Sequence, residues 1–218
     1  MEKNYLTRID KIRFFTIVDF IQRIKPKIVL DAGCGSGDYL LYLAKTSKKI
    51  YGIDFSEMGC RLSINKTKKF NNIFIKKADL SKKLIFQNSY FDFILCTEVL
   101  EHIKDISSVL SEFERILKNN GLILFTLPNF TTLSVENLRE KFFYKDPTHY
   151  HRYSLAKWIK LISKFFKILE IKTTTHYSSI MVFYLGFQKN IINIDKITSE
   201  IPLINKLGRE IFLLCQKK

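Results

Sequence analysis

The stretch that most constrains this chain is Gly-Cys-Gly-Ser-Gly at residues 33–37, which follows a short apolar run ending in Asp31. Such a run predicts a buried strand, and glycines directly after it let the backbone turn sharply and approach a ligand closely before a helix begins. A dinucleotide-binding loop would need a further glycine three places after its second one, and Asp38 holds that place. The spacing therefore predicts a nucleotide-type loop of another kind, and we expect that NAD does not bind.

Acidic residues end two further predicted strands. Asp54 follows the apolar residues 49–53, about 20 positions past the glycines, where one carboxylate can accept hydrogen bonds from both hydroxyls of a ribose. Asp79 follows a third predicted strand at residues 72–77. A turn or helix-capping role is the alternative for each of these acids.

Strand and helix patterns alternate through the first part of the chain. An amphipathic helix is predicted over residues 7–25, and it should cover one edge of the sheet or the mouth of the ligand site. Its apolar positions are Ile9, Ile12, Phe15, Val18, Ile21 and Ile24. Five strand-then-helix units follow, and the clearest helix, at residues 105–118, should stop at Gly121. The alternation predicts a doubly wound α/β fold with a mostly parallel sheet and a ligand at its carboxyl edge.

The C-terminal part of the chain is less regular. A short helix is predicted over residues 135–143, and another amphipathic helix begins after Ser154. The last two strands are predicted at residues 167–173 and 210–215. Between them, the apolar cluster at residues 180–188 could line a substrate pocket or bury itself against the sheet.

Residues 97–103 read Thr-Glu-Val-Leu-Glu-His-Ile directly after the fourth predicted strand. In sequence order, the glycine loop with its preceding acid, Asp54, Asp79 and this segment each stand at a strand end. The set resembles the class I S-adenosylmethionine-dependent methyltransferases. The resemblance covers residues 26–128 and implies a seven-stranded sheet whose last strand is antiparallel. The Asp-Pro-Thr-His stretch at residues 146–149 is similar to one in members that methylate small molecules or sugars.

The resemblance implies one methyltransferase domain over residues 1–218. In it, residues 1–25 form a helical cap, residues 26–128 form the cofactor-binding core, and residues 129–218 supply the substrate-side loop, helices and last two strands. S-adenosylmethionine is the implied cofactor. The residues implied to hold it are Asp31, Gly33, Gly35, Gly37, Asp54, Phe55, Asp79, Leu80, Thr97 and Glu98.

Methyl transfer itself asks little of the protein, because the sulfonium carbon of the cofactor is already electrophilic. The protein must hold the acceptor in line with that carbon and, for a hydroxyl acceptor, remove its proton. Histidine suits that task near pH 7. His102 lies in the cofactor-facing segment and His149 in the irregular loop over the same edge, so both are candidate general bases. We expect O-methylation of a small molecule or glycan.

Two other functions stay open. Glu98, Glu101 and His102, with a later histidine, resemble the divalent-metal site of enzymes that methylate the terminal 2′-hydroxyl of small RNAs. On a helical turn these three side chains can face one side, and Mg²⁺ or Mn²⁺ would suit them. A metal would also need a donor from residues 149–151. Because the motif recurs without metal, we expect no metal site and activity that survives EDTA. The other possibility is a cofactor-binding regulator without activity.

The chain carries a formal net charge of +15. This charge favours attraction to anions, such as RNA or a membrane surface, although its lysines lie in short groups rather than in one run. No apolar run approaches the roughly 18 residues of a transmembrane helix, and the N-terminus has no secretory leader. Four cysteines without paired spacing predict free thiols in the cytoplasm.

Overall fold

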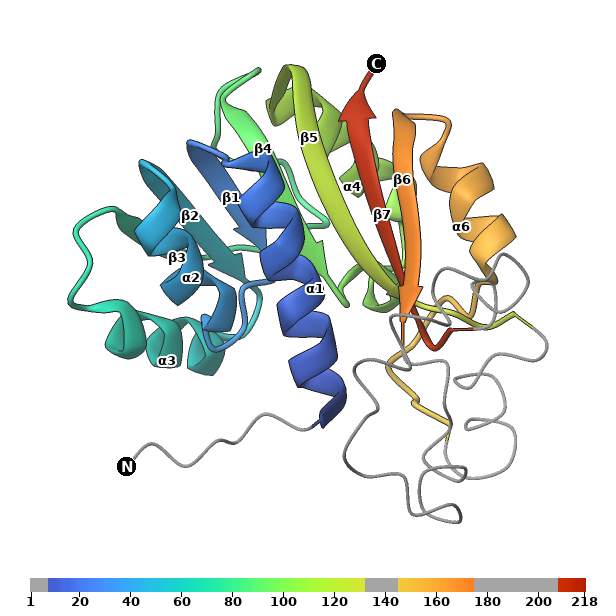
Figure 1. The fold of residues 1–218 in the computed structure, drawn as a ribbon, viewed down its shortest axis with the longest axis horizontal. Coiled ribbons are helices and arrows are strands. Elements are labelled where there is room, and N and C mark those ends of the chain that lie inside the picture. The colour runs from blue at the N-terminus through green and yellow to red at the C-terminus, as the bar shows by residue number, and fades with distance from the viewer. Residues whose placement is uncertain (1–7, 132–144, 175–207) are drawn as a thin grey trace.

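The computed structural model describes residues 8–131, 145–174 and 208–218, and its centre is a seven-stranded sheet of order β3-β2-β1-β4-β5-β7-β6 (Figure 1). β7 is antiparallel to both of its neighbours, and the other neighbouring strands are parallel. The predicted α/β fold with an antiparallel last strand is confirmed. The strands are β1 (Ile28–Ala32), β2 (Lys49–Asp54), β3 (Ile73–Lys77), β4 (Phe91–Thr97), β5 (Leu117–Pro128), β6 (Phe166–Thr174) and β7 (Glu210–Lys217).

Helices cover both faces of this sheet. The described helices are α1 (Arg8–Ile24), α2 (Asp38–Thr46), α3 (Glu57–Thr67), α4 (Ile106–Ile116), α6 (Leu155–Ile162) and the 3₁₀ turn η1 (Leu100–His102). α1 and α2 pack on one face, α4 and α6 pack on the other, and α3 lies beside β2 and β3 (Figure 1). Along β4 the buried side chains alternate, with Phe93 and Leu95 toward α1 and Ile94 and Cys96 toward α4.

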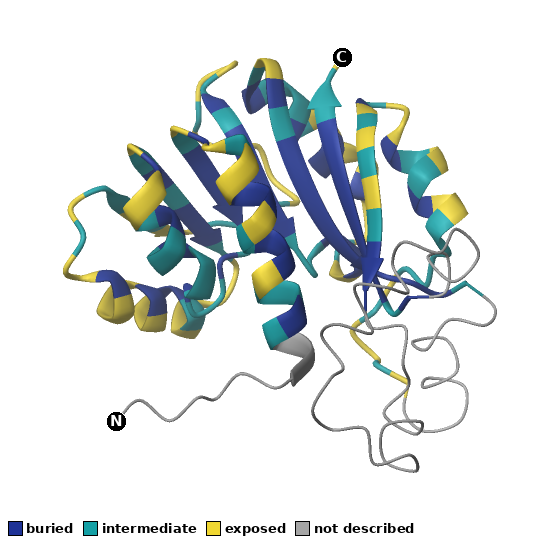
Figure 2. Cartoon of the chain, in the orientation of Figure 1, coloured by how far each residue is buried: buried dark blue, intermediate teal, exposed yellow. Residues whose placement is uncertain are grey.

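The central strands are therefore buried on both sides, as their dark blue colour in Figure 2 shows, which explains why their sequences are apolar runs rather than alternating patterns. Each fully buried side chain of the size of Phe93 contributes about 1.5–3 kcal/mol relative to an exposed one. The core therefore fixes the strands, and the functional side chains lie on the loops at their carboxyl ends.

Helix α1 lies across a face of the sheet rather than at its edge. Its buried stripe includes Ile17, Phe20 and Ile21, which follow the i, i+3, i+4 pattern. The predicted stripe was wrong at Phe15, which is 59% exposed. A strict three-residue spacing drifts around a helix of 3.6 residues per turn, so the predicted positions could not all share one face.

Helix α4 ends earlier than predicted, at Ile116, and the chain passes directly into β5. Leu117 pairs with Phe91, and the register then shifts before Leu122. Gly121 therefore lies inside the strand and does not stop the helix. A Cβ at Gly121 would lie 2.8 Å from the Lys118 carbonyl oxygen, so close backbone packing explains the glycine.

The connection from β3 to β4, residues 78–90, contains no helix, which corrects the predicted alternation. Arg115 of α4 holds this connection by donating hydrogen bonds to the carbonyl oxygens of Phe86 (2.9 Å) and Leu84 (3.2 Å). Glu112 accepts from the Leu84 backbone N–H at 2.7 Å and pairs with Arg115. Side chains of α4 thus satisfy the backbone groups of Leu84 and the carbonyl oxygen of Phe86 in this connection.

The remaining predictions divide between described and undescribed residues. The last two strands are confirmed as β6 and β7, and Ser154 caps α6 as expected by accepting from the Lys157 backbone N–H. The four cysteines are free and buried. None of the described helices is long and apolar enough to cross a membrane. The predicted helix at 135–143 and the apolar cluster at 180–188 lie outside the described residues.

Candidate cofactor and acceptor site

The glycine loop after β1 has the strained backbone that its sequence predicts. Gly33, Gly35 and Gly37 all have positive φ, of 85°, 49° and 81°. The N–H groups of Gly33 and Cys34 donate to the Ile53 carbonyl oxygen at 2.8 and 2.9 Å, which fixes the loop against the end of β2. The glycines differ in their surroundings. A Cβ on Gly33 would lie 2.3 Å from Val99 Cγ2, whereas one on Gly35 would meet nothing within 4 Å.

Alanine at the two positions should therefore have separable effects. Gly33→Ala combines a steric clash with a left-handed backbone and should lower the free energy of unfolding by roughly 2–4 kcal/mol. Gly35→Ala has only the backbone cost of about 1–2 kcal/mol, but its methyl group would project into the open space in which a ligand would lie. Urea denaturation checks the first effect and cofactor calorimetry the second. Equal destabilisation by both variants would contradict this assignment.

Asp31 lies beneath the loop, entirely buried. Neither carboxylate oxygen has a hydrogen-bond partner among the described residues, and burial, with the nearby charges of Asp54 and Asp38, raises the pKa of Asp31 to about 8. An orphaned buried carboxyl next to an open glycine loop fits a cationic ligand such as the ammonium or sulfonium of S-adenosylmethionine. Because Asp31 has no exposed surface, it would act on that charge through the loop rather than by surface contact.

The raised pKa predicts a pH-dependent stability of the ligand-free protein. The folded pKa of about 8 lies above the ordinary value of 3.8, so between about pH 4 and 8 the unfolded chain binds fewer protons than the folded chain. Stability should therefore fall as pH rises through this window and level off above it. Asp31→Asn should flatten the decline. A pH series of urea denaturation on both proteins measures the effect, and parallel curves would contradict it.

Asp54 and Asp79 both hold turns, which is the alternative role drawn from the sequence. Asp54 accepts from the Gly35 and Ser56 backbone N–H groups, both at 2.8 Å. Asp79 accepts from the Ser81 backbone N–H and hydroxyl, which lower the pKa of Asp79. Each carboxylate keeps further acceptor capacity, so a turn role is compatible with ligand binding. Phe55, beside Asp54, is 74% exposed.

Two of the remaining expected residues are partly buried: Leu80 lies in the loop after β3, and Thr97 ends β4. Glu98 follows Thr97 in a left-handed conformation with φ 51°. The Glu98 backbone N–H donates to the Thr126 carbonyl oxygen at 3.0 Å, and its carboxylate accepts from the Thr126 hydroxyl. The contacts of the Glu98 carboxylate are thus with Thr126 on β5 and with α1.

On α1, Glu98 meets Arg13, a residue that the sequence analysis missed. Arg13 Nη2 lies 3.3 Å from Glu98 Oε2 and 2.6 Å from Glu210 Oε1, at the start of β7. Burial alone would lower the pKa of Arg13, but the two carboxylates raise it above its ordinary value. Burial raises the pKa of Glu210 to about 7 despite the Arg13 charge. The sequence did contain a hint of this role. Arg13 lies four residues before Ile17, so it is a charged residue on the same face of the helix as the buried stripe.

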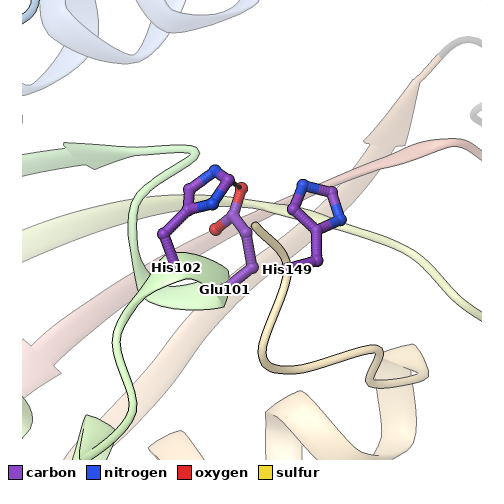
Figure 3. Close-up of side chains that lie close together, drawn as sticks. All are labelled: Glu101, His102 and His149. Carbon is purple, nitrogen blue, oxygen red and sulfur yellow. Dashed lines mark ion pairs between the residues drawn. The ribbon is translucent and has the colours of Figure 1, made fainter. Parts of the chain in front are cut away.

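Glu101, His102 and His149 form a second polar group, shown in Figure 3. One ligand atom from each lies within 4.8 Å of the others, and Glu101 Oε1 is 3.8 Å from His102 Nε2. Burial, and then the charge of Glu98, raise the pKa of Glu101 well above its ordinary value. Glu98, which the sequence also allowed beside Glu101 and His102, is not one of the three residues grouped here, although its charge still acts on Glu101. The third member is His149.

The loop that carries His149 is tied to η1 by the main chain. The N–H groups of Tyr150 and His151 donate to the Glu101 carbonyl oxygen at 2.8 and 3.3 Å. His151 Nε2 lies 2.8 Å from the Ile103 carbonyl oxygen. Both predicted histidines, His102 and His149, thus lie at the carboxyl edge of the sheet, on the side where the glycine loop also lies.

A seven-stranded doubly wound sheet of this order, with a glycine loop after β1 and acids at the next strand ends, is the architecture of class I methyltransferases. The chain matches the family described as "Methyltransferase domain" over residues 9–165. It belongs to this family, whose cofactor is S-adenosylmethionine.

Curated relatives agree with the family but match only part of their own length. The chain is 27% identical over 125 residues to a ubiquinone biosynthesis O-methyltransferase of Nitrosomonas europaea, covering 57% of this chain and 53% of that protein. It is 30% identical over 119 residues to a demethylmenaquinone methyltransferase of Staphylococcus haemolyticus, covering 53% and 49%. The matched region thus spans about half the length of these relatives.

The solved structures show a shared fold. The PH0226 protein from Pyrococcus horikoshii OT3 superposes with a TM-score of 0.71 at 16% identity, over 99% of this chain and 94% of that one. At this identity the likeness concerns the fold alone.

Proposed function

We propose that this chain transfers the methyl group of S-adenosylmethionine to a hydroxyl oxygen of a small molecule or sugar. The observation that carries the proposal is the position of Glu101, His102 and His149 at the carboxyl edge that also bears the open glycine loop. A nitrogen acceptor with a free lone pair can attack the methyl group without a base that removes a proton first. A hydroxyl must lose its proton, and this cluster is where we place that event.

The cofactor would lie along the glycine loop. Gly33, Gly35 and Gly37 would leave room for it, and a cationic part of the cofactor above the loop would favour the ionised form of the Asp31 carboxyl beneath it. Asp54 with Phe55 would hold the ribose side, and Asp79 with Leu80 the adenine side. Thr97 and Glu98 would lie between the cofactor and the acceptor. S-adenosylmethionine supplies the electrophilic methyl group when bound, and the protein supplies alignment and handling of the acceptor proton.

The relatives support an acceptor of small size. One of them is named as an O-methyltransferase of ubiquinone biosynthesis, and the other acts on demethylmenaquinone. These names support quinone precursors as the first acceptors to test beside sugars. The net charge of +15 supports an anionic partner and makes an RNA 3′ terminus the comparison acceptor.

Two measurements test the proposal. Calorimetry should show binding of S-adenosylmethionine and its demethylated product, and no binding of NAD. A methyl-transfer assay with labelled cofactor should then label a phenolic quinone precursor or a sugar in preference to a short RNA with a free 3′-terminal diol. NAD binding without S-adenosylmethionine binding would contradict the cofactor. Exclusive labelling of the RNA, lost after periodate oxidation of its diol, would contradict the acceptor.

A further inference from the structure

Glu101 provides a buried carboxyl group whose two oxygens have no hydrogen-bond partner among the described residues. Its side chain is 1% exposed. The nearest basic atom is His102 Nε2, at 3.8 Å, which is beyond hydrogen-bond distance. A buried carboxylate without a partner is costly, because desolvation is not repaid by any contact. The Glu101 carboxyl therefore lacks, among the described residues, a partner that would offset the cost of its burial.

The hydrogen bonds of His102 determine which of its two ring nitrogens carries the proton. His102 Nδ1 lies 3.1 Å from the Thr148 carbonyl oxygen, which can only accept a hydrogen bond. It also lies 3.1 Å from the Thr148 hydroxyl, whose own proton is donated to Asp146 at 2.7 Å. Nδ1 must therefore carry the ring proton. In the neutral imidazole, Nε2 then presents a lone pair toward the Glu101 carboxylate.

An ionised Glu101 and the lone pair of His102 Nε2, 3.8 Å apart, could both bind one metal ion. A carbonyl oxygen that holds the far ring nitrogen is the usual outer support of a histidine ligand. An acid also lies near His149, since its Nε2 is 3.8 Å from Asp146 Oδ2, which is an ion-pair distance rather than a hydrogen bond. Metal–ligand bonds of about 2.0–2.2 Å place neighbouring donors about 3–4 Å apart. The 3.8 Å between Glu101 and His102 lies in this range, whereas separations up to the 4.8 Å limit of the cluster would have to shorten when an ion binds.

We infer that Glu101, His102 and His149 bind one divalent transition-metal cation. Two imidazoles and one carboxylate favour Zn²⁺ or Mn²⁺ over Mg²⁺ and Ca²⁺, which prefer oxygen ligands. The sequence led us to expect no metal site, and this inference replaces that expectation. It also differs from the metal-binding alternative considered there, whose ligands were Glu98, Glu101 and His102. The structure supplies from His149 the loop donor that such a site requires, and it assigns Glu98 to Arg13 instead.

The role of the ion rests on the proposed function. The acceptor hydroxyl would bind at an open position of the cation, which lowers the pKa of that hydroxyl. Its O–H bond breaks and the proton passes to water, so the oxygen keeps the electron pair. That oxygen then attacks the methyl carbon, the C–S bond breaks, and its electron pair stays on sulfur. The products are the methyl ether and the neutral thioether of the cofactor.

Metal binding itself can be tested without any acceptor. The purified full chain, stripped with EDTA and dialysed, is titrated separately with Zn²⁺, Mn²⁺ and Mg²⁺ by calorimetry, with Mn²⁺ also followed by its free-ion electron paramagnetic resonance signal. We expect one Zn²⁺ or Mn²⁺ per chain and weaker binding of Mg²⁺. At a free concentration 100 times the Kd, the bound ion should raise Tm by roughly 5–10 °C.

Matched variants decide whether the cluster is the site. Glu101→Gln and His149→Ala should weaken binding at least tenfold, while Glu98→Gln should bind the ion as the wild type does. His102 is 38% exposed, so His102→Ala gives the same test if the buried variants fail to fold. No binding above the Mg²⁺ level, or unchanged binding in Glu101→Gln and His102→Ala, would overturn the inference. S-adenosylmethionine binding measured without metal reports on the proposed function separately.

Discussion

Replacing His102 with alanine is expected to lower methyl transfer by roughly 10²–10⁴-fold while the affinity for S-adenosylmethionine changes by less than about twofold. The imidazole lies in the group that handles the acceptor proton, whereas the proposed cofactor contacts lie on the glycine loop and strand ends. Turnover with labelled cofactor and calorimetry of cofactor binding measure the two quantities. His149→Ala should behave alike, because its ring belongs to the same group.

His151 offers a matched histidine control for this result. It lies two residues after His149, but its Nε2 contacts the main-chain oxygens of Ile103 and Lys104 rather than the cluster. Glutamine at this position keeps a donor for those oxygens, so His151→Gln should retain most of the turnover. A turnover loss in His151→Gln as large as in His102→Ala would show that the loop, not the cluster, is responsible.

Arg13→Gln is expected to lower the free energy of unfolding by about 3–5 kcal/mol at pH 7, the usual result of removing one partner from a buried ion pair. It leaves Glu98 and the buried Glu210 without their shared cation. The pKa of Glu210, about 7 with Arg13 present, rises further in the variant, so the deficit should grow as pH rises above about 7 and shrink as pH falls below it. Urea denaturation between pH 6 and 9 measures it.

The same helix carries the control. Arg23 pairs with Glu170 at 3.0 Å, but both side chains are substantially exposed, so Arg23→Gln should change stability by less than about 1 kcal/mol. Adding Glu210→Gln to Arg13→Gln should recover part of the loss, because one unpaired buried charge is removed. Equal losses in the Arg13 and Arg23 variants would contradict a buried role for Arg13.

The fold followed from local patterns in the sequence. Apolar runs gave each parallel strand, the glycines at residues 33–37 gave the ligand loop, and Asp105 and Ser154 were recognisable helix caps. These signals are local because they depend on propensity and periodicity within a few residues. The end of α4 was missed because it depends on pairing of Leu117 with Phe91, which lies far away in the sequence.

The sequence identified most residues of the site but not which of them lie together. His102 and His149 were identified, but their contact joins a 3₁₀ turn to a loop 47 residues later, and no local pattern specifies such a contact. The left-handed backbone of Glu98 could not be foreseen either, because a positive φ is uncommon for a glutamate. Arg13 was missed because its partners, Glu98 and Glu210, come together only when α1, β4 and β7 have assembled.

The helix-free connection between β3 and β4 should open on its own before the sheet unfolds. Its side-chain anchors are Arg115, which donates to the Leu84 and Phe86 carbonyl oxygens and to Asn88, and Glu112, which accepts from the Leu84 backbone N–H, rather than a continuous helical ladder. Transient loss of these contacts would expose the amides of residues 84–88 to solvent while the strands on either side stay paired. Amide hydrogens there should exchange through local fluctuation, far faster than those of β4, so this segment is the natural place for the fold to accept inserted residues without losing its core.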